Sequence, residues 1–215
     1  MVGSGTRAAE VFRAPDAKAG RPVVVFVHGW TANRPEAYGA WIRHLVAAGA
    51  DVVFPIYQGP PFLDVRSPLP NVQAALRAAF ARLRGHGAVI AAGHSAGGAL
   101  SSDYAASAEA AGLPSPVAVY AVYPGRDLGL GRFLAGPPLA RIPPGTRLLA
   151  LASPTDRVVG TATAEAMVRD ATRVRGRLRI VRDPLLGQHN APMGDSEGVR
   201  RTFWAPLDGL LRDAN

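Results

Sequence analysis

The chain has 215 residues, 48% of them hydrophobic, and is therefore long enough for one domain with a substantial core. Its 24 basic and 16 acidic residues give a formal net charge of +8. The lack of cysteine excludes disulfides, thiolate metal sites and a cysteine nucleophile. No run of roughly 18 apolar residues occurs, so no membrane-spanning helix is expected.

The N-terminal segment lacks the basic patch and apolar core of a secretory signal. We therefore expect a cytoplasmic protein, with a secreted mature form that has lost its signal as the alternative. Residues 1–215 are expected to form one domain, in which residues 1–20 are an extension with a short edge strand near Ala9 to Phe12.

Short apolar runs then alternate with segments of helical period. The predicted strands are residues 22–29, 50–57, 88–95, 116–124, 146–153 and 177–183. Five of these runs are almost continuously apolar, as expected for parallel strands covered on both faces. The predicted helices are residues 36–48, 71–84, 96–111, 163–173 and 196–212. This order predicts an α/β fold: a mostly parallel central sheet of six to seven strands with helices on both faces.

Two segments rich in glycine and proline interrupt this alternation. Residues 59–70 (GPPFLDVRSPLP) follow a strand end, the side on which open α/β sheets bind ligands. Residues 125–145 are too rich in glycine and proline for a long helix and predict a short connection with one helical turn at residues 130–134.

The positive charge raises the possibility of an anionic partner. The densest basic stretch, residues 169–182, alternates arginine with apolar residues and has no interleaved aromatic residues. This pattern favours a strand with a solvated face over an anionic-surface or nucleic-acid patch. We therefore expect no nucleic-acid partner.

The sequence Gly93-His94-Ser95-Ala96-Gly97 has the form G-x-S-x-G and joins an apolar strand to an alanine-rich helix. The glycines permit a sharp strand-to-helix turn that exposes the serine hydroxyl, and the next amide points at the same space. Ser95 is therefore a candidate nucleophile.

A serine nucleophile needs a base, and the base needs a group that orients it. Asp156 follows the predicted strand 146–153, and His189 lies in the loop after the last strand. The order Ser95, Asp156, His189 is that of the α/β-hydrolases. Asp127, which follows the preceding strand, is the rival carboxylate.

The chain resembles a small α/β-hydrolase of the serine esterase and lipase kind from about residue 22 to 211. The resemblance lies in FVHGW, GHSAGG, SPTDRVV and QHN. It implies that the backbone amides of Trp30 and Ala96 form an oxyanion hole. His28 and His94 are expected to be structural.

The resemblance implies hydrolysis of carboxylic esters through an acyl-enzyme, with a small-molecule ester as substrate and no metal or organic cofactor. In that family larger caps usually follow the strand predicted here at residues 116–124, so the short connection implies a minimal cap and favours short to medium acyl chains. The expected cleft wall is Trp30, Tyr57, Phe62, Tyr123 and Leu185. A thioesterase or acyltransferase with the same triad and, less favoured, a noncatalytic binding module are the alternatives. The sequence does not determine the oligomeric state.

Overall fold

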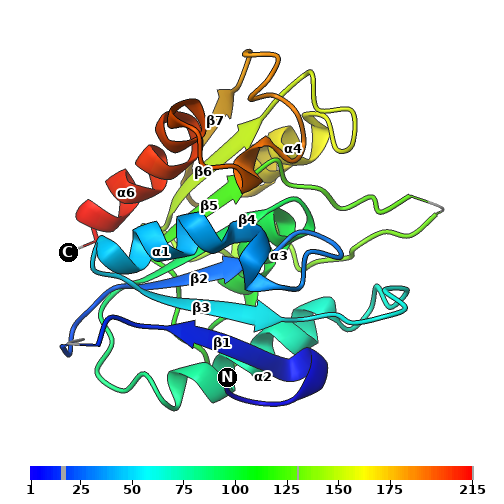
Figure 1. Cartoon of the computed structure of the whole chain (residues 1–215). Coiled ribbons are helices and arrows are strands. Elements are labelled where there is room, and N and C mark those ends of the chain that lie inside the picture. The colour runs from blue at the N-terminus through cyan, green and yellow to red at the C-terminus, as the bar shows by residue number, and fades with distance from the viewer. Residues whose placement is uncertain (16–17, 130, 215) are drawn as a thin grey trace.

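The protein folds around a seven-stranded sheet, seen here in a computed structural model that describes residues 1–15, 18–129 and 131–214 (Figure 1). The strand order is β1-β3-β2-β4-β5-β6-β7. Only β1 is antiparallel to its neighbour. The strands are β1 (Ala8–Phe12), β2 (Val23–Val27), β3 (Asp51–Ile56), β4 (Val89–His94), β5 (Ala118–Val122), β6 (Arg147–Ala152) and β7 (Arg175–Ile180).

Helices cover both faces of the sheet (Figure 1). One face packs against α2 (Pro68–Phe80), α3 (Ala96–Ser107) and α4 (Ala162–Asp170). The other packs against α1 (Gly39–Ala47) and the C-terminal segment. Short 3-10 turns complete the fold: η1 (Gly5–Arg7), η2 (Pro35–Tyr38), η3 (Leu139–Arg141) and η4 (Ala191–Met193). The α/β class and the two-sided helical cover predicted from the sequence are confirmed.

The central strands are buried because their side chains on both faces are apolar. All five residues of β2 (VVVFV) are buried, as are all residues of β4 and β5. Valine and isoleucine suit such positions, since their branched side chains pack well on a pleated surface. Two apolar clusters result, one on each side of the sheet.

The two edge strands meet solvent differently. The predicted N-terminal edge strand is β1, which pairs along its length with β3. At the opposite edge, β7 alternates exposed and half-buried residues. Its exposed positions are Arg175, Arg177 and Arg179. Residues 175–180 of the basic stretch therefore form a strand with a solvated face, while residues 169 and 170 end α4.

The C-terminal helix is less regular than expected. The predicted helix 196–212 consists of α5 (Glu197–Val199), a π-helical turn η5 (Arg200–Trp204) and α6 (Ala205–Arg212). Pro206 has no backbone N–H, so the α-helical hydrogen-bond ladder cannot pass through it unbroken. The segment still packs Phe203, Trp204 and Leu207 onto the sheet.

The connection from β5 to β6 contains no α-helix among its described residues. The helical turn expected at residues 130–134 was wrong for 131–134, where Phe133 instead forms an isolated β-bridge with Asp127; residue 130 lies outside the described residues. Within the described part of the chain, no helix is long and apolar enough to cross a membrane.

Candidate active site

Ser95 lies in a tight turn between β4 and α3. Its backbone φ is 58° and its ψ is −127°, a combination that residues with a side chain adopt only under strain. A Cβ at Gly93 would lie 2.3 Å from the carbonyl oxygen of Gly97, and one at Gly97 would lie 2.0 Å from that of Val27. Only glycine fits at either position, which explains the G-x-S-x-G pattern.

His189 connects Ser95 with a carboxylate. Its Nε2 lies 2.9 Å from Ser95 Oγ, and its Nδ1 lies 2.7 Å from Asp156 Oδ2. Ser95 follows β4, Asp156 follows β6 and His189 lies in the loop after β7. Because parallel strands end at one edge of the sheet, residues up to 94 positions apart in sequence meet there.

Asp156 is held by three hydrogen bonds and is 3% exposed. Besides His189, the amides of Val158 and Val159 donate to its Oδ1 at 2.8 and 3.1 Å. Burial alone would raise the pKa of Asp156, but these hydrogen bonds, led by that from His189, outweigh burial and lower it. The ionised carboxylate accepts the Nδ1 proton of His189, so Nε2 is free to accept the serine proton.

The rival carboxylate occupies a different place. Asp127 is exposed and accepts the Gly129 amide through Oδ1 at 2.8 Å, and no hydrogen bond joins it to His189. The described structure therefore pairs the histidine with Asp156, as the sequence favoured.

The two amides expected to stabilise an oxyanion flank the serine. Ala96 begins α3, so no carbonyl of that helix accepts its N–H. Trp30 lines the same cavity as Ser95, and within the described residues its amide has no backbone acceptor. A Cβ on the adjacent Gly29 would lie 3.3 Å from Ser95 Cβ, which brings the Trp30 loop against the serine.

His28 supports this loop from behind. Its Nδ1 donates to the Gly29 carbonyl at 2.7 Å, and its ring stacks on Tyr57 at 4.2 Å. Burial lowers the pKa of His28 to about 4, so its ring is neutral near pH 7. These contacts are those of a structural histidine.

The cavity beside Ser95 has a volume of about 390 Å³. Loops from several strand ends form its wall: Trp30, Ser95, Gly125, Asp127, Leu128, Gly129, Val158, Val159 and His189. Of the five wall residues expected from the sequence, only Trp30 contributes. The wall residues that the prediction missed lie in the loops that follow β5 and β6. Their position after the end of a parallel strand could have identified them from the sequence.

The other four expected wall residues lie elsewhere. Tyr57 and Tyr123 are buried, and their hydroxyls donate to the carbonyls of His28 and Leu186. Phe62 faces a neighbouring hollow that Tyr57 also lines. Leu185 is 81% exposed and does not line the cavity. Apolar character identified these side chains, but their direction depends on the folded loops.

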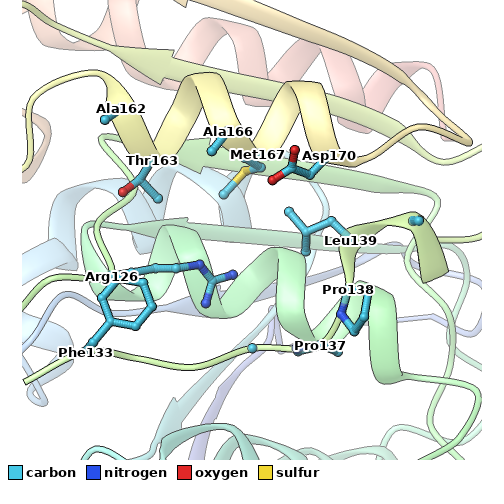
Figure 2. Close-up of a pocket in the computed structure, with 12 residues that line it drawn as sticks. Arg126, Phe133, Pro137, Pro138, Leu139, Ala162, Thr163, Ala166, Met167 and Asp170 are labelled. Carbon is cyan, nitrogen blue, oxygen red and sulfur yellow. The ribbon is translucent and has the colours of Figure 1, made fainter.

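A larger hollow of about 580 Å³ lies between α4 and the β5–β6 connection (Figure 2). Thr163, Met167 and Asp170 of α4 face Arg126, Phe133 and Leu139 across it. It contains neither Ser95 nor His189. In the part of the chain that the structure describes, no cluster of three histidine, aspartate or glutamate side chains is placed to hold a metal ion.

A family model described as the alpha/beta hydrolase fold matches residues 24–136, and the chain belongs to this family. A comparison with curated protein sequences gives no match.

Solved esterase structures resemble the protein. One is an esterase from the bacterial hormone-sensitive lipase family, with a TM-score of 0.73 and 21% identity over 96% of this chain and 80% of the other. Another is a fungal esterase from Rhizomucor miehei, with a TM-score of 0.71 and 19% identity over 96% and 79%. Carboxyl esterase 2 from Tuber melanosporum has a TM-score of 0.71 and 19% identity over 96% and 80%. At such identities the likeness concerns the fold.

Proposed function

We propose that the protein is a serine hydrolase that cleaves carboxylic esters through an acyl-enzyme. The observation that carries this proposal is the continuous contact from Ser95 Oγ through the His189 ring to Asp156, at 2.9 and 2.7 Å. The resemblance of the fold to solved esterases supports the same reaction class.

In the first half-reaction, His189 Nε2 takes the proton of Ser95 as Oγ forms a bond to the ester carbonyl carbon. Asp156 stabilises the resulting imidazolium. The developing oxyanion accepts hydrogen bonds from the amides of Trp30 and Ala96, and removal of one such donor typically costs about 3 kcal/mol of transition-state stabilisation. Collapse of the intermediate breaks the ester C–O bond, and the departing alcohol takes the proton from His189.

In the second half-reaction, water repeats these steps. His189 accepts a proton from the water as its oxygen attacks the acyl carbon, and the proton then passes to Ser95 Oγ as the acid departs. Every proton transfer in this scheme therefore passes through His189 Nε2.

The substrate is proposed to be an ester with a short or medium acyl chain. The cavity beside Ser95, with a volume of about 390 Å³, lies at the small end of the usual size range for ligand pockets. The connection that follows β5, residues 123–146, contains no α-helix among its described residues and so provides no helical cap. Leu128, Val158 and Val159 provide an apolar wall for an acyl chain.

The same atoms could transfer an acyl group from a thioester or to an alcohol acceptor, and these reactions remain the alternatives. A noncatalytic binding module is disfavoured because the serine, histidine and carboxylate are joined by two short contacts. A panel of esters, thioesters and amides, with and without alcohol acceptors, separates the enzymatic possibilities.

The primary test replaces Ser95 with alanine. Ser95→Ala should lower ester hydrolysis by at least about 10⁴-fold and abolish labelling by a fluorophosphonate, with an unchanged circular dichroism spectrum. Ser4→Ala, at an exposed serine far from Ser95 in sequence, is the matched control and should behave as wild type. Hydrolysis by Ser95→Ala at the wild-type rate would contradict the proposal.

A further inference from the structure

His94, the residue before the serine, lies at the centre of a buried hydrogen-bond relay. Its Nδ1 is 2.9 Å from the hydroxyl oxygen of Tyr38, and its Nε2 is 2.8 Å from the carbonyl oxygen of His189. The Tyr38 oxygen in turn accepts the Gly29 amide at 3.0 Å. His94 is 2% exposed and Tyr38 is 1% exposed, so water does not compete with the hydrogen bond between their side chains.

The partners determine where each proton lies. The His189 carbonyl can only accept, so His94 Nε2 carries the hydrogen. In a neutral ring Nδ1 then accepts, and the Tyr38 hydroxyl must donate to it. Burial, reinforced by the neighbouring His189, lowers the pKa of His94 to about 3, in agreement with a neutral ring. All three hydrogen bonds are thus satisfied by one tautomer.

One end of the relay holds the loop that carries His189. Residues 181–190 contain no helix or strand. The hydrogen bond from His94 is the only one that the His189 main chain makes within the described residues. Pro192, three residues later, has no N–H to offer the His189 carbonyl.

The other end holds the loop that carries Trp30. The Gly29 amide donates to Tyr38, and Trp30 follows immediately. Packing here is close: a Cβ at Gly29 would lie 3.2 Å from the Tyr38 hydroxyl and 3.4 Å from His94 Nδ1. The relay therefore joins the proposed oxyanion loop, the serine turn and the histidine loop.

We propose that His94 is a positioning residue, whose neutral imidazole sets the main chain of His189 and, through Tyr38, that of Gly29 relative to Ser95. The kinetic consequences of this inference rest on the proposed function. The tautomer assigned to His94 rests on the hydrogen-bond geometry alone. His94 touches neither the ester nor the transferred proton in this scheme.

The first experiment requires no substrate. Nitrogen-15 NMR of the histidine-labelled wild-type protein, assigned with His94→Gln, should show protonated Nε2 and unprotonated Nδ1 on His94 at pH 7. The opposite tautomer, or a charged ring, would overturn the proposal. This result is independent of whether the protein hydrolyses esters.

The second experiment separates the two arms of the relay. In His94→Gln the amide nitrogen can occupy the place of Nε2 and still donate to His189, whereas the shorter side chain of His94→Asn reaches only toward Tyr38. With a short nitrophenyl ester, His94→Asn should lower kcat roughly 10- to 100-fold with KM nearly unchanged, because misplacement of a reacting group by about 1 Å has effects of this size. His94→Gln should restore most of this loss.

Two further variants make the outcome decisive. His86→Gln is the matched control, because His86 also contacts a backbone carbonyl through its ring but lies before β4, at the opposite end of that strand. It should retain wild-type kcat. If His94→Asn does not fold, Tyr38→Phe preserves the ring volume, removes the Gly29 arm and should also lower kcat.

Two outcomes distinguish this inference from the proposed function. A folded His94→Asn with wild-type kcat would overturn the positioning role of His94. A wild-type protein inactive on every ester would overturn the proposed function and leave the tautomer result unaffected.

Discussion

Two of the histidines nearest the serine are buried and neutral. Burial lowers the pKa of His28 to about 4, and burial together with His189 lowers the pKa of His94 to about 3, from an unperturbed value of 6.5. Both rings use their nitrogens to hold main-chain or tyrosine oxygens. The hydrogen-bonded nitrogens of both rings are therefore engaged elsewhere, and His189 is the base of the proposed mechanism.

These histidines should make stability depend on pH. Below pH 6.5 the unfolded chain binds protons that the folded His94 does not, so the free energy of unfolding falls as pH drops toward about 3. Between pH 7 and 5 the loss from His94 should be about 2 kcal/mol, with a similar contribution from His28. Urea unfolding at both pH values measures it.

The variant His94→Gln isolates the contribution of that ring. Its loss of stability between pH 7 and 5 should be smaller than that of the wild type by about 2 kcal/mol. His86→Gln, whose ring is only partly buried, serves as the comparison. Equal pH dependence in His94→Gln and wild type would argue against a neutral buried ring.

At the scale of elements, helix α3 has two roles. It begins directly after Ser95, and it also anchors the loop after β5 that lines the cleft. Asp103 of α3 is completely buried and pairs with both terminal nitrogens of Arg126, at 2.9 and 2.5 Å. Arg126 also donates to the Leu134 carbonyl at 3.2 Å. Residues 127–129, which line the cavity, follow Arg126 directly.

Loss of the arginine should therefore affect both stability and the cleft. Arg126→Gln leaves a buried carboxylate without its cation and should lower the free energy of unfolding by about 3 kcal/mol, measured by urea denaturation. KM for a short ester should rise as the loop loosens. Adding Asp103→Asn should recover part of the stability, because no charge then remains buried.

An exposed ion pair provides the matched control for this experiment. Arg169 and Asp170 pair at 2.8 Å on the surface of α4, with 70% and 52% of their side chains exposed. Arg169→Gln should change stability by less than about 0.5 kcal/mol. If Arg126→Gln behaved in the same way, the buried pair would not anchor the loop.

At the scale of the whole molecule, the parallel sheet brings the ends of β2, β4, β5, β6 and β7 to one edge (Figure 1). The serine, the histidine and the cavity wall all come from segments that follow these strands. Without a helical cap in the described β5–β6 connection, the size of the cleft is determined by short loops.

This architecture predicts a preference for chain length. With nitrophenyl esters of increasing length, kcat/KM should pass through a maximum at short or medium acyl chains and fall beyond roughly eight carbons, because the apolar wall of Leu128, Val158 and Val159 gives a longer chain little further contact. The series is measured below the critical micelle concentration of each ester. A steady rise well past that length would show that the cleft extends further than its loops suggest.

The sequence by itself determined the fold class, an edge strand near residues 9–12, the serine turn and the strand ends that carry Asp156 and His189. These features depend on local patterns: apolar period, glycine at sterically restricted positions, and the order of strands along the chain. Local patterns also located the C-terminal helix, although they missed its π-helical turn.

Only the tertiary structure decided which carboxylate meets His189, which side chains line the cavity, and what His94 contacts. Asp127 and Asp156 both follow strands in the sequence, and only Asp156 contacts the ring. Tyr57 and Tyr123 are aromatic residues of the kind expected in a cleft wall, but they are buried and their hydroxyls donate to main-chain carbonyls. Such contacts join residues 29 to 95 positions apart through irregular loops. The path of these loops depends on packing across the whole molecule and leaves no periodic pattern in the sequence.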